Sequence, residues 1–193
     1  MQNKNFVIRL SIWAMMTAIV FLGNFLRITI PVSLGGVSAF TLANILCALS
    51  GILLGPVGGF LASGLGSALY DVTNPAYVTE APITFFTKGM YGLIAGLILV
   101  LLFRAKKAKY VSQLVATICA AVAYMVVYLA KNYFYNAMLI QGYRGVTQCW
   151  AYVVTKIPAT ITNGVIAVIF APILGVTIIQ ALRKAHLDYL LTK

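Results

Sequence analysis

Charged residues are scarce in this chain, and acidic residues are almost absent. Only 9% of its 193 residues are charged, whereas a soluble domain usually carries about 25%. This shortage excludes an ordinary soluble globular domain. Fourteen Lys and Arg residues against three acids give a net charge of +11. Because these cations are sparse and lie between apolar runs, they indicate membrane topology and contact with anionic lipid, and not nucleic-acid binding.

The sequence also lacks the residues of common catalytic and metal sites. It has one histidine, His186, and three widely spaced cysteines, Cys47, Cys119 and Cys149, with no metal-ligand spacing among them. No G-x-S-x-G, H-E-x-x-H or phosphate-binding loop occurs, and no acids are paired. We therefore expect no enzyme activity, no metal, no cofactor and no ability to hydrolyse ATP alone.

Long apolar runs fill most of the chain, and 62% of the residues are hydrophobic. In lipid only a helix or a closed barrel satisfies all backbone polar groups, and a spanning helix needs about 20 apolar residues. The sequence predicts an all-α integral membrane protein: a bundle of six transmembrane helices in a single domain, 1–193. The helices are expected at residues 7–27, 39–54, 57–72, 81–103, 111–138 and 149–181, with Gly55-Pro56 as a tight break between the second and third.

The cations divide unevenly between the two sides of this predicted bundle. One side holds nine of them: Lys4, Arg9, Arg104, Lys106, Lys107, Lys109, Arg183, Lys184 and Lys193. The other side holds only Arg27 and Arg144. Because cytoplasmic loops of membrane proteins are rich in Lys and Arg, both termini are predicted to be cytoplasmic.

Polar side chains are predicted to lie at one depth in the outer half of the membrane. Lys88, Lys131 and Lys156 each lie seven residues from the outer end of a predicted helix, roughly 10 Å below the surface at 1.5 Å per residue. Intramembrane polar groups are costly and usually line a cavity. The predicted substrate contacts are Lys88, Lys131, Asn132 and Lys156, followed by Asn44, Asp71 and Tyr128.

This polar layer is typical of a cup that opens outward and is closed below. The inner halves of the helices are nearly all apolar, as in 97–103 and 165–174, whereas a water-filled channel would need polar groups along its whole length. The excess of cations favours a neutral-polar or anionic ligand. The alternative is that the lysines only extend to the outer head groups of the lipid.

Ala14 and Ala18 form a pair of small residues four positions apart in the first predicted helix. Small side chains let helix backbones approach closely in lipid. From the residues alone, the pair serves either packing inside the bundle or contact with a partner helix.

Several stretches together resemble one family of membrane proteins. They are Phe40-Thr-Leu-Ala-Asn-Ile, Leu54-Gly-Pro-Val-Gly-Gly, Gly64-Leu-Gly-Ser-Ala-Leu-Tyr-Asp and Ala81-Pro-Ile-Thr-Phe-Phe-Thr-Lys-Gly, followed by Ala95-Gly96. With its length, helix count and charge pattern, the chain resembles the substrate-binding (S) component of the energy-coupling factor (ECF) transporters, which import vitamins.

The resemblance implies a mechanism and a set of partners. An S component in a bacterial cell membrane binds a vitamin from outside, closes its cup with a loop, here about Thr29 to Ala39, and then topples in the membrane. An ECF transmembrane coupling subunit and two ATPase subunits drive this cycle. The resemblance assigns Ala14 and Ala18 to docking on the coupling subunit.

The resemblance leaves the vitamin open, and we expect a member of the cobalamin, hydroxymethylpyrimidine or pyridoxine branch. Two other classes remain. A structural membrane scaffold without a small-molecule substrate would not need a polar layer at one depth. A self-sufficient carrier would need a gated path through the inner half, which the sequence does not show.

Overall fold

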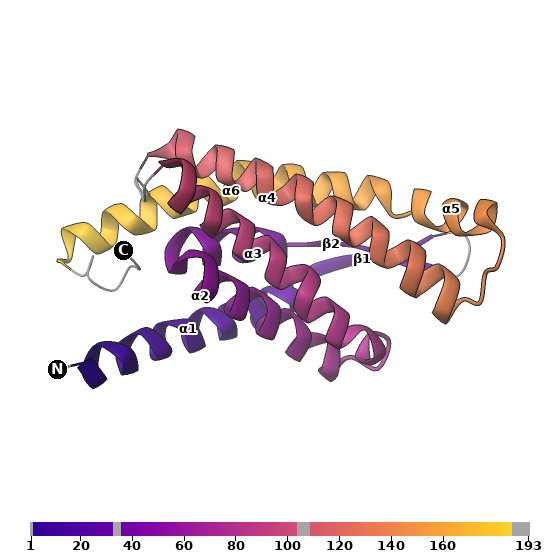
Figure 1. Ribbon diagram of the computed structural model, residues 1–193, viewed down its shortest axis with the longest axis horizontal. Helices are drawn as coiled ribbons and strands as arrows, with labels where there is room; N and C mark the ends of the chain where they lie inside the picture. The colour runs from indigo at the N-terminus through magenta and orange to yellow at the C-terminus, as the bar shows by residue number, and fades with distance from the viewer. Residues whose placement is uncertain (1, 33–35, 104–108, 187–193) are drawn as a thin grey trace.

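The computed structural model describes residues 2–32, 36–103 and 109–186 (Figure 1). Its main helices are α1 (Gln2–Phe25), α2 (Ala43–Thr73), α3 (Ala81–Phe103), α4 (Tyr110–Lys131), α5 (Val146–Val154) and α6 (Ile157–Lys184). Two strands, β1 (Arg27–Val32) and β2 (Gly36–Thr41), lie between α1 and α2. A 3-10 turn, η1 (Val78–Glu80), precedes α3, and a π-helical segment, η2 (Asn132–Ile140), continues α4.

The helical membrane fold is confirmed, but the count of six spanning helices is not. Within the described residues, five helical segments are long and apolar enough to cross a membrane: Phe6–Phe25, Ala43–Thr73, Val78–Leu102, Tyr110–Ile140 and Val146–Lys184. The predicted helices 39–54 and 57–72 fall together in α2, and residues 39–41 belong to β2. The predicted helix 149–181 is interrupted between α5 and α6.

The two halves of α2 fold back on each other at Gly55. The backbone leaves the helical conformation there (φ 78°, ψ −171°), and Pro56 follows. The hydroxyl oxygens of Ser50 and Ser63 are 2.6 Å apart, although 13 residues of straight helix would separate them by about 20 Å. Glycine is suited to this reversal because a positive φ costs it little. Thus a break is present at Gly55-Pro56, as predicted, and it joins two antiparallel halves of α2.

Glycines let this hairpin pack directly on α3. A Cβ atom added at Gly51 would lie 2.2 Å from the carbonyl oxygen of Gly92, and one added at Gly92 would lie 2.3 Å from the carbonyl oxygen of Gly59. Both distances are shorter than any real contact, so the backbones themselves touch. Such close approach is the usual role of small residues in membrane helices.

The core of the molecule lies where α2 meets α1, α3, α4 and α6. Val20, Ile52 and Tyr91 are fully buried there. Many large apolar side chains on the outside of the bundle, such as Leu22 and Leu139, are exposed. A soluble protein rarely exposes so much apolar surface, whereas lipid solvates it well.

The start of α1 and the end of α6 lie at the same end of the molecule, together with the end of α3 and the start of α4 (Figure 1). Lys109, Arg183 and Lys184 belong to this end. Of the other predicted inner cations, Arg104, Lys106, Lys107 and Lys193 lie outside the described residues. The side of the membrane that this end faces stays a prediction.

The segment predicted as a covering loop contains a β-hairpin. β1 and β2 pair antiparallel from Arg27 opposite Thr41 to Val32 opposite Gly36; residues 33–35, within the predicted loop Thr29–Ala39, lie outside the described part. A lone two-stranded hairpin is marginal by itself. Here the backbone N–H of Thr41 donates to Asn163 Oδ1 of α6 at 2.9 Å, which ties the base of the hairpin to the bundle.

Candidate substrate-binding site

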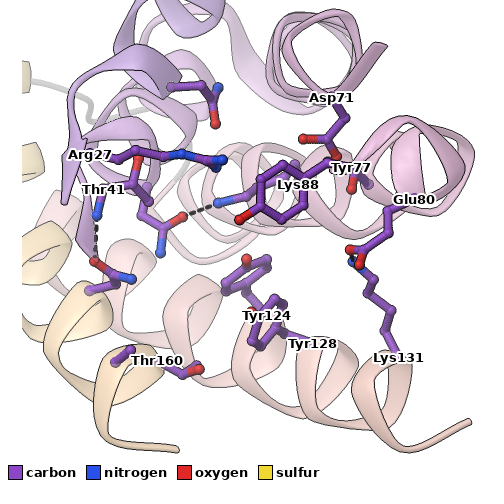
Figure 2. A pocket seen from close by; sticks show the side chains of 15 residues that line it. Arg27, Thr41, Asp71, Tyr77, Glu80, Lys88, Tyr124, Tyr128, Lys131 and Thr160 are labelled. Atoms are coloured by element: carbon purple, nitrogen blue, oxygen red, sulfur yellow. Dashed lines mark hydrogen bonds and ion pairs between the residues drawn. The ribbon is translucent and has the colours of Figure 1, made fainter. Parts of the chain in front are cut away.

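A polar cavity of about 110 Å³ lies between the base of the β-hairpin and helices α2, α3, α4 and α6 (Figure 2). Five of the predicted substrate contacts line it: Asn44, Asp71, Lys88, Tyr128 and Lys131. The other lining residues are Asn24, Arg27, Thr41, Tyr77, Glu80, Thr84, Tyr124, Ala159, Thr160 and Asn163. These five residues, which were selected from the sequence, belong to three different helices and line one cavity in the structure.

Lys88 extends from α3 into the cavity and is only 9% exposed. Its ammonium donates a hydrogen bond to Asn44 Oδ1 at the start of α2 and lies 4.9 Å from the centre of the Tyr124 ring. Both contacts are with neutral groups. Burial of this lysine inside the protein argues against a role in which it only reaches for lipid head groups.

Lys131 has a different partner. Its ammonium forms an ion pair with Glu80 of η1, and the two side chains are 6% and 21% exposed. It also lies 5.9 Å from the centre of the Tyr128 ring. Glu80 was not selected as a site residue from the sequence. In the structure it neutralises one of the three cations of the cavity.

Two tyrosines of α4, Tyr124 and Tyr128, form an aromatic wall on one side of the cavity, and Tyr91, which does not line the cavity, stacks on Tyr124. The rings of Tyr91 and Tyr124 are 5.1 Å apart with an interplanar angle of 12°, and those of Tyr124 and Tyr128 are 5.6 Å apart at 29°. Tyr124 and Tyr128 are four residues apart in α4 and therefore share a face. A flat aromatic wall of this kind can stack on a planar ring of a ligand.

Arg27 was counted only as an outer-loop cation from the sequence, but it lines the cavity. Its guanidinium lies 4.6 Å from the centre of the Tyr70 ring and 4.4 Å from that of Tyr77. Burial raises the pKa of Tyr77, with the Arg27 charge opposing this, so the phenol is neutral at neutral pH. No sequence signal shows this stacking, because the three residues come from separate elements.

Asn132 and Lys156 do not line this cavity. They line a second one of about 190 Å³, together with Asn136, Gln141 and Tyr152. Lys156 is 3% exposed, and its ammonium lies 4.9 Å from the centre of the Tyr152 ring. Asn132 donates to the Tyr128 carbonyl at 2.8 Å and accepts from Asn136 at 3.0 Å.

The two cavities are neighbours, since Tyr77, Glu80 and Tyr128 line both. Each is smaller than the roughly 300–1,000 Å³ of a typical site for a drug-sized ligand. A vitamin can therefore enter only if the hairpin or the wall between the cavities moves.

Other polar lining residues were visible in the sequence but were not selected. Asn24 lies near the predicted depth, and Asn163 lies deeper. In the structure Asn24 donates to the Val20 carbonyl at 2.8 Å and to Ser67 at 3.4 Å, and Asn163 holds Thr41. Thr84 could have been found from its spacing, because it lies one helical turn before Lys88 on the same face.

Ala14 and Ala18 lie elsewhere, in an apolar groove of about 370 Å³ between α1 and the second half of α2. Both are exposed, and Phe21, Leu69 and Val72 complete the groove. Within the described residues no other helix covers this pair. Its role in docking stays a prediction.

Comparison with known proteins identifies a family and a fold. The family model described as "ECF-type riboflavin transporter, S component" matches residues 4–184. A solved structure described as the S component of a bacterial ECF transporter superposes with a TM-score of 0.61 at 20% sequence identity, covering 96% of this chain and 99% of that one. No match was found among curated protein sequences.

Proposed function

Because the chain belongs to the family of S components of ECF-type riboflavin transporters, we propose that it binds riboflavin and carries it across the cell membrane. Membership makes the chain a multi-pass membrane protein of a vitamin importer and not an enzyme. It does not support the expected cobalamin, hydroxymethylpyrimidine or pyridoxine substrate, since the family points to riboflavin instead. The family match over nearly the whole chain is the observation that carries this proposal.

The chemistry of the cavity supports a flavin as ligand. Riboflavin combines a flat ring, which bears polar edge groups, with a hydroxylated chain. The stacked Tyr124 and Tyr128 rings offer a flat surface for the ring system. Asn44, Lys88 and Asn163 supply amide and ammonium groups for its polar atoms. We assign direct contact to Lys88, Asn44 and Tyr128, and further contacts to Asp71 and Lys131.

The second cavity supplies the remaining proposed contacts. Asn132 and Lys156 would reach a ligand only after it displaces the wall formed by Tyr77, Glu80 and Tyr128. A ligand longer than either cavity would then occupy both. This explains how two small neighbouring spaces could serve one vitamin.

Transport requires partners that this chain does not contain. The proposed complex has an ECF transmembrane coupling subunit and two ATPase subunits, which hydrolyse ATP. The groove at Ala14 and Ala18 would receive the coupling subunit, and the termini would face the cytoplasm. The β-hairpin, anchored by Thr41, would cover the ligand from outside.

Fluorescence titration of the purified subunit tests the substrate. Stacking against tyrosine quenches flavin fluorescence, so we expect a saturable loss of riboflavin emission as protein is added. Thiamine in excess should not restore the emission. Absence of riboflavin binding by folded protein that binds a different vitamin would overturn the proposed substrate.

A further inference from the structure

The charges of the first cavity are unevenly compensated. Arg27, Lys88 and Lys131 are its cations, and Asp71 and Glu80 are its acids. Glu80 forms an ion pair with Lys131. Asp71 lies within ion-pair distance of no cation in the described part of the chain. Arg27 and Lys88 are therefore left without an ion-pair partner in the described part of the chain.

Lys88 is the more deeply buried of these two cations. Its contacts, Asn44 Oδ1 and the face of Tyr124, orient the ammonium but carry no opposite charge. A buried charge is costly unless it is paired. An anion next to the Lys88 ammonium would remove this cost.

Arg27 presents its donors in a way that suits an anion. The rings of Tyr70 and Tyr77 lie near its guanidinium at 4.6 and 4.4 Å, while its five N–H groups point outward within the guanidinium plane. That guanidinium donates no hydrogen bond within residues 2–32, 36–103 and 109–186. A fork of free N–H donors matches phosphate and carboxylate oxygens in two-point contacts.

The acids lie away from this pair of cations. In Figure 2 the ends of Arg27 and Lys88 reach the same side of the cavity, and Asp71 and Glu80 lie opposite. A negative group on the ligand would be repelled from the acidic side and attracted to the other. The cavity thus distinguishes the two ends of a charged ligand.

Resting on the function proposed above, we propose that Arg27 and Lys88 bind an anionic group of the ligand, so that this protein prefers a flavin bearing a phosphate ester or a carboxylate to neutral riboflavin. One negative charge on the ligand would balance the net charge of +1 that these five side chains carry. The anion also contacts Arg27, the first residue of β1, at the base of the hairpin.

Paired titrations with riboflavin and its phosphate ester, flavin mononucleotide, test this preference. The full-length subunit is purified in a neutral maltoside detergent, and both dissociation constants are measured by fluorescence quenching. Charge-assisted contacts are about twice as strong as neutral ones, and we expect the phosphate ester to bind about tenfold more tightly or better. The preference should fall with added salt, and inorganic phosphate should compete with the ester more than with riboflavin.

Charge-removing variants locate the anion. Arg27→Gln and Lys88→Gln should each reduce the ratio of the two affinities by about tenfold, while Arg27→Lys, which keeps the charge, should retain part of it. Arg144→Gln is the matched control, because Arg144 is exposed and lines neither cavity. It should leave the ratio unchanged. Size-exclusion profiles identify any variant that fails to fold, and Arg27→Lys then carries the comparison.

The outcomes separate this inference from the proposed function. Riboflavin bound as tightly as its phosphate ester would overturn the anion site and leave riboflavin binding in place. A preference that survives both Arg27→Gln and Lys88→Gln would also overturn it. Binding of neither flavin would overturn both proposals. Displacement of the ester by phosphatidylglycerol added to the micelles would show that the pair binds a lipid phosphate, and would overturn the ligand assignment.

Discussion

At the scale of single residues, Lys88 is the cavity cation whose role in binding is most directly testable. It is held by Asn44 and Tyr124 with its ammonium in the cavity. A hydrogen bond to a charged group contributes roughly 1.5–3 kcal/mol. We expect Lys88→Met to weaken flavin binding about ten- to hundredfold, as measured by titration of folded protein. Lys109→Met, an exposed cation at the opposite end, should bind like the unmodified chain, and equal affinities in both variants would remove Lys88 from the site.

The ion pair between Lys131 and Glu80 predicts that losing one partner destabilises the protein more than losing both. Removing one partner of a buried pair costs roughly 3–5 kcal/mol because the other charge is left uncompensated. The cost here should be smaller, since the Glu80 side chain is 21% exposed. We expect the double variant Lys131→Met/Glu80→Gln to be more stable to heat than Lys131→Met alone. Additive losses would show that the two side chains do not interact in the folded protein.

The limits of sequence interpretation at this scale follow from backbone geometry. Counting 1.5 Å per residue placed Lys88, Lys131 and Asn44 at one depth, and they do share a cavity. Asn132, where the π-helical segment begins, and Lys156, in the break between α5 and α6, line the neighbouring cavity instead. Both departures from the α-helix change the direction in which later side chains point.

At the scale of elements, the close packing of α2 on α3 depends on glycine. A Cβ atom at Gly92 would lie 2.3 Å from the Gly59 carbonyl oxygen and 2.5 Å from Ser63 Oγ. We expect Gly92→Ala to lower the melting temperature of the purified protein markedly, because two backbones would have to separate.

Gly164→Ala is the matched control for that substitution. An added Cβ there meets only Ala121, at 4.0 Å. Because alanine is favoured over glycine inside a helix by roughly 0.5–1 kcal/mol, we expect this variant to be as stable as the unmodified chain or slightly more so. Equal melting temperatures for both variants would contradict the packing described here.

The elements show which features of the fold local patterns could predict. Gly55-Pro56 signalled a break, because glycine and proline punctuate helices by local chemistry. The antiparallel contact of Ser50 with Ser63 depends on the direction of the chain after the break, which no local pattern encodes. The pairing of β1 with β2 was also missed, since these short strands depend on anchors such as Asn163, 122 residues away from Thr41 in the chain.

At the scale of the whole molecule, the reversal in α2 explains how a chain with five spanning segments has both termini at the same end of the bundle. α1, α3, α4 and α6 lie along the long axis of the molecule, while α2 turns back at Gly55 (Figure 1). The start of α1 and the end of α6 therefore lie at one end. The excess of Lys and Arg there predicts that this end faces the cytoplasm.

Labelling of single cysteines from outside the cell tests this orientation. In a variant without Cys47, Cys119 and Cys149, we expect Arg144→Cys to react with a membrane-impermeant maleimide and Lys109→Cys to react only after the cells are opened. Both positions are exposed, so a difference in reaction reports the side of the membrane. The reverse pattern would invert the protein and turn the proposed cup toward the cytoplasm.

The groove at Ala14 and Ala18 separates binding from transport. The two small side chains leave an apolar depression on the outside of the bundle, which shares no lining residue with either polar cavity. A partner helix can approach closely there because no side chain holds it away. We expect Ala14→Leu and Ala18→Leu to abolish flavin uptake by cells while the isolated subunit still binds flavin with unchanged affinity. Ala151→Leu adds the same bulk to an exposed alanine of α5, outside the groove, and should transport normally. Loss of flavin binding in the isolated, folded Ala14→Leu subunit would show that the pair supports the packing of α1 on α2, and docking would then have to use another face.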